Sequence, residues 1–250
     1  MRAFGLSETG PVRHMNEDSF VSADDLRLFI VADGMGGHAA GEVASRVAVE
    51  SIENFIRRSH ETTDFSWPFG IDPTLSYEAN RLKTAVSLAN RRINRLAENH
   101  DDYLGMGTTV VCALLSENQL VVAHVGDSRL YIRNGNGLTQ LTKDDSWAAT
   151  VLGSKGAGGG SQAATRHVLT NVLGARPDTL VHLAERELSG DETLLLCSDG
   201  LHGSVPHETL EEIMASNEEL PAIAQTLVSK ALEHGSRDNI TALVVRCSAQ

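Results

Sequence analysis

Aspartate residues recur in this sequence at the ends of short apolar runs. Asp33, Asp127 and Asp199 each follow such a run, Asp18 lies near the N-terminus, and Asp238 comes just before the last run. Taken singly, each is most simply a turn residue, because aspartate favours turns. Antiparallel strands can, however, deliver their ends to one rim of a sheet, where gathered carboxylates repel one another unless a cation neutralises them. The five positions together therefore predict a cation site.

The ligand chemistry narrows the choice of cation. Carboxylate oxygens, backbone carbonyls and water suit Mg²⁺ or Mn²⁺. Structural zinc would need Cys and His pairs at short spacing, and the sequence contains neither these nor an EF-hand loop pattern. Two such ions, about 3.5–4 Å apart, can lower the pKa of a bridging water and hold a phosphoryl group. Phosphate-ester chemistry is therefore one reaction that the predicted site can support.

Strands must bring these aspartates together, and the apolar runs have the right length and composition. They are short and rich in β-branched residues, as strands are. Residues 108–115 and 119–125 are separated by three residues, 116–118, which predicts a hairpin. The predicted strands are 28–32, 108–115, 120–125, 130–132, 194–197 and 240–245.

Four other segments are expected to be helices. Apolar residues recur at helical spacing over 43–56, 82–96 and 220–232, and a shorter helix is expected over 207–215. Two helices thus fall early and two late, with strands between and around them. This distribution is typical of an antiparallel α+β fold and not of βαβ repeats.

The composition disfavours several classes of protein. The 250 residues include 21 basic and 33 acidic ones, a net charge of −12, which disfavours a nucleic-acid groove. Cys112, Cys197 and Cys247 all lie in apolar runs, so we expect buried thiols in a reducing compartment. Neither a signal peptide nor an apolar run of roughly 20 residues is visible. We therefore expect a cytoplasmic protein that does not insert into membranes.

Seven short segments stand out along the sequence. They are RHMNED (13–18), VADGMGGH (31–38), MGTT (106–109), VGDSR (125–129), LTKD (141–144), CSDGL (197–201) and RDNIT (237–241). In this order they resemble the motifs of the PP2C (PPM) metal-dependent Ser/Thr protein phosphatases, bacterial type. One such motif alone would be weak evidence, but together they extend over nearly the whole chain.

The resemblance implies a fold and a domain organisation. The family fold is a four-layer α-β-β-α sandwich of two antiparallel sheets flanked by helices, which agrees with the predicted elements. We expect a single phosphatase domain over residues 1–250. Bacterial relatives usually carry a helical flap after the LTKD motif, and here the corresponding segment, 146–166, is rich in glycine. A short or mobile flap is therefore expected.

The resemblance also implies metal ligands. Asp33 would bridge two Mn²⁺ or Mg²⁺ ions, and the Gly34 carbonyl would help to bind the first. Asp199 and Asp238 would hold the second ion. Asp127, together with Asp199, would form the third-metal site of bacterial members.

Further roles follow from the same resemblance. Glu17 and Asp18 would position metal-bound waters, and the planar fork of Arg13 would hold the substrate phosphate. A water that bridges the metals would attack phosphorus in line with the departing Ser or Thr oxygen, without a phosphoenzyme. The sequence has no Cys-x₅-Arg nucleophile loop, which supports direct attack by water.

Some positions depart from the family pattern or have weaker signals. Met35 stands where eukaryotic members commonly place a His as candidate general acid, so no side chain is assigned to that role and metal-bound water is the expected acid. His38 is expected at a helix start and His124 in the core. For Asn239, a contact with the site and a turn role are equally favoured.

Two alternatives to a protein phosphatase remain. A catalytically silent PP2C-like module that binds phosphoproteins would be expected to lack a metal carboxylate, whereas Asp33, Asp199 and Asp238 are all present. A phosphatase acting on a small phosphorylated metabolite is not separated from the protein phosphatase by sequence. We expect phosphorylated protein substrates of a Ser/Thr kinase, no nucleic-acid partner, and a monomer.

Overall fold

Two antiparallel sheets form the centre of the protein in the computed structural model, which describes residues 1–36, 40–61, 67–146 and 168–247. The first sheet has the strand order β1 (Arg2–Glu8), β11 (Ile240–Arg246), β10 (Thr193–Cys197), β7 (Arg129–Asn134), β8 (Gly137–Gln140). The second has the order β2 (Asp18–Ala23), β3 (Leu28–Met35), β5 (Val110–Ser116), β6 (Gln119–Val125), β9 (His182–Glu187), and β4 (Gly107–Thr108) also pairs with β3.

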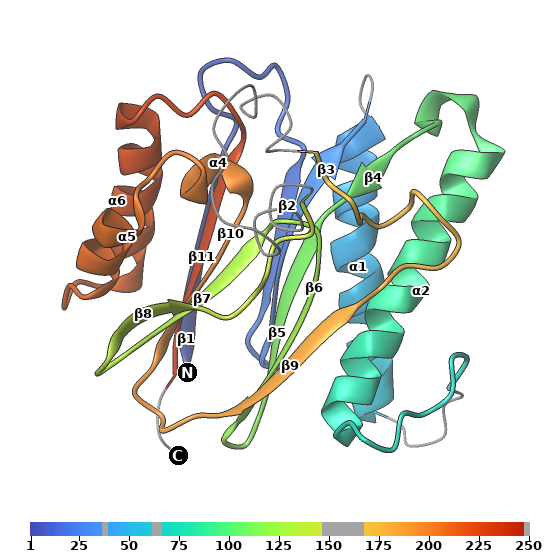
Figure 1. Ribbon diagram of the computed structural model, residues 1–250, viewed down its shortest axis with the longest axis horizontal. Helices are drawn as coiled ribbons and strands as arrows, with labels where there is room; N and C mark the ends of the chain where they lie inside the picture. The colour runs from blue at the N-terminus through green and yellow to red at the C-terminus, as the bar shows by residue number, and fades with distance from the viewer. Residues whose placement is uncertain (37–39, 62–66, 147–167, 248–250) are drawn as a thin grey trace, which may run out of the picture.

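Helices cover the outer face of each sheet (Figure 1). The long helices α1 (Ala40–Glu61) and α2 (Tyr77–Asn99) lie on the second sheet, whereas α5 (His207–Met214) and α6 (Leu220–Glu233) lie on the first. A single-turn helix, α4 (Asp199–His202), follows β10, and a 3₁₀ turn, Asp101–Tyr103, follows α2. The layers are therefore helix, sheet, sheet and helix, which confirms the expected four-layer α+β sandwich.

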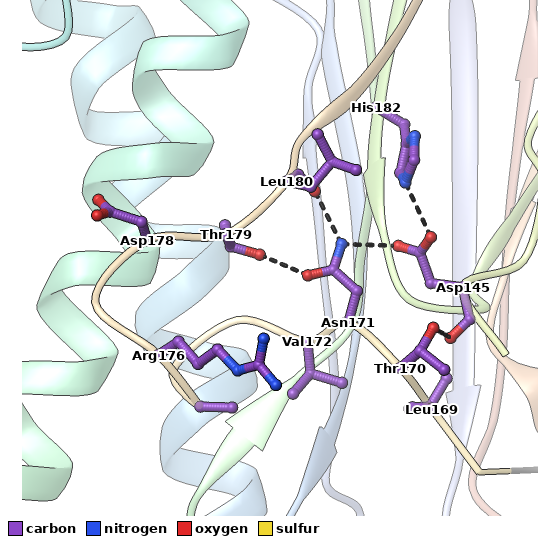
Figure 2. A pocket seen from close by; sticks show the side chains of 11 residues that line it. Asp145, Leu169, Thr170, Asn171, Val172, Arg176, Asp178, Thr179, Leu180 and His182 are labelled. Atoms are coloured by element: carbon purple, nitrogen blue, oxygen red, sulfur yellow. Dashed lines mark hydrogen bonds and ion pairs between the residues drawn. The ribbon is translucent and has the colours of Figure 1, made fainter. Parts of the chain in front are cut away.

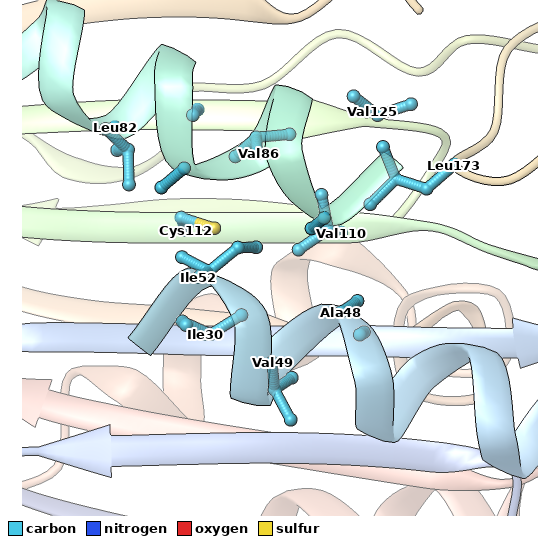
Figure 3. Close-up of a cluster of buried hydrophobic side chains, with 14 of the residues drawn as sticks. Ile30, Ala48, Val49, Ile52, Leu82, Val86, Val110, Cys112, Val125 and Leu173 are labelled. Atoms are coloured by element: carbon cyan, nitrogen blue, oxygen red, sulfur yellow. The ribbon is translucent and has the colours of Figure 1, made fainter. Parts of the chain in front are cut away.

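Three apolar clusters fill the three interfaces between these layers. Along β3, Ile30 and Ala32 face α1 and α2, whereas Phe29 and Val31 face the first sheet. The strand is therefore buried on both faces, which explains why its sequence is continuously apolar and does not alternate. Figure 3 shows Ile30 and Cys112 packed beneath side chains of the two long helices. Full burial of each such large side chain contributes about 1.5–3 kcal/mol.

The four predicted helices are confirmed, and their ends have local causes. Helix α2 begins after Ser76, whose hydroxyl accepts a hydrogen bond from the Ala79 amide at 3.1 Å. Helix α6 carries a proline, Pro221, in its first turn, where the missing amide hydrogen is no loss. The apolar stripes predicted for both helices face the sheets.

Strands are found at all six predicted places, with two differences: the run 108–115 is divided at Thr109 into β4 and β5, and the hairpin is shifted by one residue. Strand β5 extends to Ser116, so the β5–β6 turn has two residues, of which Glu117 adopts a positive φ of 50°. Strands β1, β2, β8 and β9 were not predicted. Strand β9 is polar and largely exposed at an edge of its sheet, so it lacks the apolar signal on which strand prediction depends.

Several other expectations can be compared with the described residues. The three cysteines are free and buried, as predicted. Within the described ranges, no helix is both long and apolar enough to cross a membrane. His38 and nearly all of the expected flap, residues 147–166, lie outside the described residues.

Candidate active site

A cavity of about 220 Å³ lies where the ends of β3, β6 and β10 meet the loop between β1 and β2. In Figure 1 these elements meet at the upper end of the molecule, beside α4. The cavity gathers charged side chains from segments far apart in sequence. Its lining includes Arg13, Glu17, Asp33, Gly34, Asp127, Asp199 and Asp238.

Hydrogen bonds of the main chain fix the position of Asp33. In the β2–β3 register Asp33 lies directly opposite Asp18. The Asp33 amide donates to Thr109 Oγ1 at 3.1 Å, and its carbonyl accepts from the Thr109 amide at 2.9 Å and from Thr108 Oγ1 at 2.8 Å. Because these bonds fix the backbone, the Asp33 carboxylate is left to face the cavity.

Asp18 supports the site from behind and does not line the cavity. One of its oxygens, Oδ2, accepts hydrogen bonds from Ser198 Oγ at 2.7 Å and from Thr241 Oγ1 at 2.6 Å. These partners flank Asp199 and Asp238, so one buried carboxylate connects β2 to both segments that carry the other acidic residues.

Position 34 requires a glycine because the main chains of Gly41 and Glu17 approach it closely. A Cβ at this position would collide with the carbonyl oxygens of Gly41 and Glu17. The Gly34 amide donates to the Glu17 carbonyl at 3.1 Å, which ties β3 to the loop that carries Glu17. The Asp-Gly pair is thus explained by a close approach in a strand and not by turn conformation.

Asp127 lies in a turn that a second aspartate fixes. Gly126 has a φ of 98°, a conformation that glycine adopts readily. Its amide donates to Asp145 Oδ2 at 3.1 Å, and its carbonyl accepts from the Asp145 amide at 2.9 Å. Figure 2 shows Asp145 bound in turn to Asn171 at 2.9 Å and to His182 at 2.8 Å. Asp145 therefore connects this turn to the chain on the far side of residues 147–167.

Arg13 and Asp238 form an ion pair at the cavity, 2.7 Å between Nη2 and Oδ2. The next residue, Asn239, holds the loop that carries Arg13 and Glu17. Its Oδ1 accepts from the Glu17 amide at 2.9 Å, and its Nδ2 donates to the carbonyls of Thr9 and Met15. Asn239 therefore positions the site loop, and it does not line the cavity.

Burial of the carboxylates is the largest influence on the electrostatics of the cavity, and repulsion between them adds to it. Burial raises the pKa of Asp33 well above its ordinary value, and four neighbouring carboxylates raise it further. Burial likewise raises the pKa of Asp18 to about 6 and that of Asp127 to about 7. The pKa of Glu17 is raised for the same reason, with Arg13 acting in the opposite direction. A bound cation would relieve this repulsion.

The residues present fit hard divalent cations. Glu17 Oε1 and Asp18 Oδ1 are buried and have no hydrogen-bond partner among the described residues, so both can accept from ordered water. All side-chain candidates are oxygen donors, as Mg²⁺ and Mn²⁺ prefer. With Asp238 paired to Arg13, the described part of the chain holds no group of three or more His, Cys, Asp or Glu arranged to hold an ion. Occupation of the site therefore requires some of these carboxylates to turn.

Sequence reasoning missed the residues that position the carboxylates. Thr109, Ser198 and Thr241 lie within the seven motifs, but a hydroxyl residue in or beside a strand gives no signal for the group it will bind. The LTKD motif proves structural in part, because Asp144 binds Arg129 through two hydrogen bonds of 2.9 and 2.8 Å. His124 is buried, with Nε2 2.9 Å from the Lys143 carbonyl, as expected for a core histidine.

Residues 13–234 match the family model described as Protein phosphatase 2C. The chain belongs to the protein phosphatase 2C family. The serine/threonine phosphatase stp of Listeria welshimeri is 36% identical over 250 residues, which cover 98% of this chain and 95% of that relative. PstP of Mycobacterium tuberculosis is 34% identical over 249 residues, which cover 98% of this chain and 44% of PstP.

Solved structures of the protein phosphatase 2C family share the fold. The crystal structure of the Mycobacterium tuberculosis phosphatase PstP/Ppp superposes with a TM-score of 0.84 at 34% identity, covering 99% of this chain and 98% of that one. The catalytic domain of PstP in complex with two manganese ions superposes with a TM-score of 0.81, also at 34% identity and with the same coverage.

Proposed function

We propose that this protein phosphatase 2C family member hydrolyses phosphoserine and phosphothreonine in proteins, with water as the direct nucleophile and without a phosphoenzyme. The observation that carries the proposal is the cavity in which a guanidinium faces a set of repelling carboxylates. Full-length similarity to named serine/threonine phosphatases supports the same activity. The domain over residues 1–250 is proposed to act as one phosphatase unit.

Two Mn²⁺ or Mg²⁺ ions are proposed as cofactors, held by oxygen ligands. Asp33 would contact both ions, the Gly34 carbonyl would help to hold the first, and Asp199 and Asp238 would hold the second. Asp127, with Asp199, would hold a third. When bound, divalent ions of this kind acidify water and neutralise phosphoryl charge.

The remaining residues act on water and on the phosphate. Glu17 Oε1 and Asp18 Oδ1 are proposed to accept hydrogen bonds from ordered waters in the site. Arg13 is proposed to bind the phosphoryl oxygens through its planar fork of donors and to stabilise the charge that spreads over them. Because Arg13 is held on Asp238, phosphate binding requires this ion pair to open or to be shared.

The cellular setting is part of the same proposal. Buried free thiols suit a reducing compartment, and we place the protein in the cytoplasm. Its substrates are proposed to be proteins phosphorylated by a Ser/Thr kinase, and it is proposed to act as a monomer without nucleic acid.

The test is release of phosphate from a phosphothreonine peptide in Mn²⁺, in EDTA, and with Asp199→Asn. Activity should require Mn²⁺ and be lost in the variant. Asp102→Asn serves as the matched control, because Asp102 is exposed in the 3₁₀ turn and does not line the cavity. Folded protein that binds Mn²⁺ without turnover would indicate a silent phosphoprotein-binding module. Turnover of small phosphate esters but of no phosphopeptide would indicate a metabolite phosphatase.

A further inference from the structure

A second cavity, of about 670 Å³, lies between α1 and α2 and shares no lining residue with the catalytic cavity. Its wall carries four arginines, Arg58 from α1 and Arg91, Arg92 and Arg95 from α2. Among the described residues, no aspartate or glutamate lines it. The chain as a whole carries a net charge of −12, so the charge of this wall is opposite in sign to that of the protein. We call this cavity the arginine groove.

Most of the positive charge of the groove arginines is not neutralised by nearby acidic residues. Among the described residues, Arg58, Arg92 and Arg95 form no ion pair, and Arg92 donates only to Ser51 Oγ at 3.1 Å. Arg91 pairs with Asp178 at 3.3 Å, but the Asp178 side chain is 86% exposed, so solvent screens the contact.

Helix stability does not explain the arrangement on α2. Arg91 and Arg95 are four positions apart, a spacing at which like charges repel along a helix. Arg58 lies in the last turn of α1, where the helix dipole favours a cation, whereas the last turn of α2 has no basic residue. The acidic side chain of Glu53 on α1 points to Arg57, outside the groove.

The groove also offers apolar surface to a ligand. Phe55, Leu88 and Leu96 line it and are partly buried. Beside them, the Arg91 guanidinium lies 4.3 Å from the centre of the Phe69 ring. A ligand that fits must therefore combine negative charge with at least one apolar group.

We propose that the arginine groove docks an acidic segment of a protein partner, with carboxylates or phosphates on the arginines and an apolar side chain against Leu88 and Leu96. Arginine clusters recognise such oxyanions through paired donors. A concave hollow fits side chains better than the flat surface of a membrane, and the net charge of −12 opposes a polyanion as long as a nucleic acid. The inference goes beyond the proposed function, because the groove shares no residue with the catalytic cavity.

The experiment measures binding of a short fluorescein-labelled peptide with a Glu-Glu-Phe-Glu-Glu core by fluorescence anisotropy, with the full chain in EDTA. A second probe replaces two glutamates with a phosphonate analogue of phosphoserine, which separates phosphate from carboxylate as the preferred oxyanion. The test variant is Arg92→Gln with Arg95→Gln, both exposed residues. Lys83→Gln is the control, since Lys83 is also a cation of α2 whose half-exposed side chain, 3.8 Å from Asp72, lies outside the groove.

The double variant should weaken binding of at least one acidic probe by about tenfold or more, because two charge-assisted contacts are lost. Lys83→Gln should bind as the unmodified protein does. Equal binding by the double variant and the unmodified protein would overturn the proposal. So would failure of both peptides to bind while duplex DNA or phosphatidylserine vesicles bind through Arg92 and Arg95. Neither result bears on catalysis, which phosphate release measures separately.

Discussion

The catalytic cavity and the arginine groove border the same helix and are opposite in charge and in construction. Gly34 and Glu17 approach α1 at Gly41, whereas the groove uses the second half of that helix. At the catalytic cavity, hydrogen bonds fix the Asp33 main chain and the supporting Asp18 carboxylate. In the groove, arginines stand on exposed helical faces with few contacts. A fixed main chain brings several carboxylates within reach of a small hard ion, whereas long exposed side chains can adapt to a flexible partner.

The largest effect is expected when Asp33, the carboxylate with four acidic neighbours, is replaced. The replacement should lower activity but raise the stability of the metal-free protein. Asp33→Asn should lower phosphate release by at least about 1000-fold, since the proposed bridging ligand is lost. In EDTA the same variant should unfold at a higher temperature than the unmodified protein, because one of the repelling charges is gone. Calorimetry and phosphate release from a phosphopeptide measure the two effects. Lower thermal stability of the variant in EDTA would show that the buried, crowded Asp33 carboxylate does not destabilise the metal-free protein.

Arg13→Gln should have the next largest effect. The kcat/KM for a phosphopeptide should fall by about 100-fold, as expected for loss of a charged donor to the phosphoryl group. Binding of Mn²⁺ should become tighter, because Arg13 no longer competes for Asp238. Titration calorimetry with Mn²⁺ checks this sign, and weaker Mn²⁺ binding would contradict the proposed competition.

The carboxylates should also make the metal-free protein sensitive to pH. The pKa of Asp127 rises from 3.8 to about 7 in the folded protein, so between these values the folded state holds more protons and its stability falls as pH rises. In EDTA, Asp127→Asn should therefore be more stable than the unmodified protein, by a margin that grows with pH to at least about 1 kcal/mol and levels off above about pH 7. Urea unfolding at several pH values measures the margin. The pKa values of buried His124 and His202 are lowered by burial. Both groups titrate in the variant as in the unmodified protein, so their contributions cancel in the difference between the two free energies of unfolding. A margin independent of pH would refute the raised pKa.

The smallest effect is expected in the arginine groove. Arg92→Gln with Arg95→Gln should change the free energy of unfolding by less than about 0.5 kcal/mol, because both side chains are exposed. Hydrolysis of p-nitrophenyl phosphate should be unchanged, since the groove and the catalytic cavity share no residue. A loss of small-substrate turnover in this variant would mean that the two regions are coupled.

The sequence was most informative where chemistry and periodicity coincide. The apolar run before Asp33 and the helical stripes of α1, α2 and α6 were predictable because burial imposes their patterns. The seven motifs contain the acidic site residues, and the structure places six of the seven predicted side chains and Gly34 around one cavity. Asp18 is the exception, behind the cavity.

Other features could not be predicted because they depend on long-range contacts. The role of Asp145 rests on Gly126, Asn171 and His182, which only the folded chain brings together. The Arg13–Asp238 ion pair joins residues 225 positions apart. Strand β9 is a strand because β6 offers it a partner, and not because of its own composition.

Contacts between the two ends of the chain, which include the pairing of β1 with β11, have a consequence for folding during synthesis. During synthesis, Arg13 and Glu17 leave the ribosome long before Asp238 and Asn239, to which they bind in the folded protein. A nascent chain that ends before Asp238 therefore lacks both the Asp238 carboxylate and the Asn239 anchor of the site loop. Contacts between residues so far apart in sequence slow folding, and the Arg13–Asp238 ion pair and the anchor of the site loop can form only after residues 238 and 239 have been synthesised.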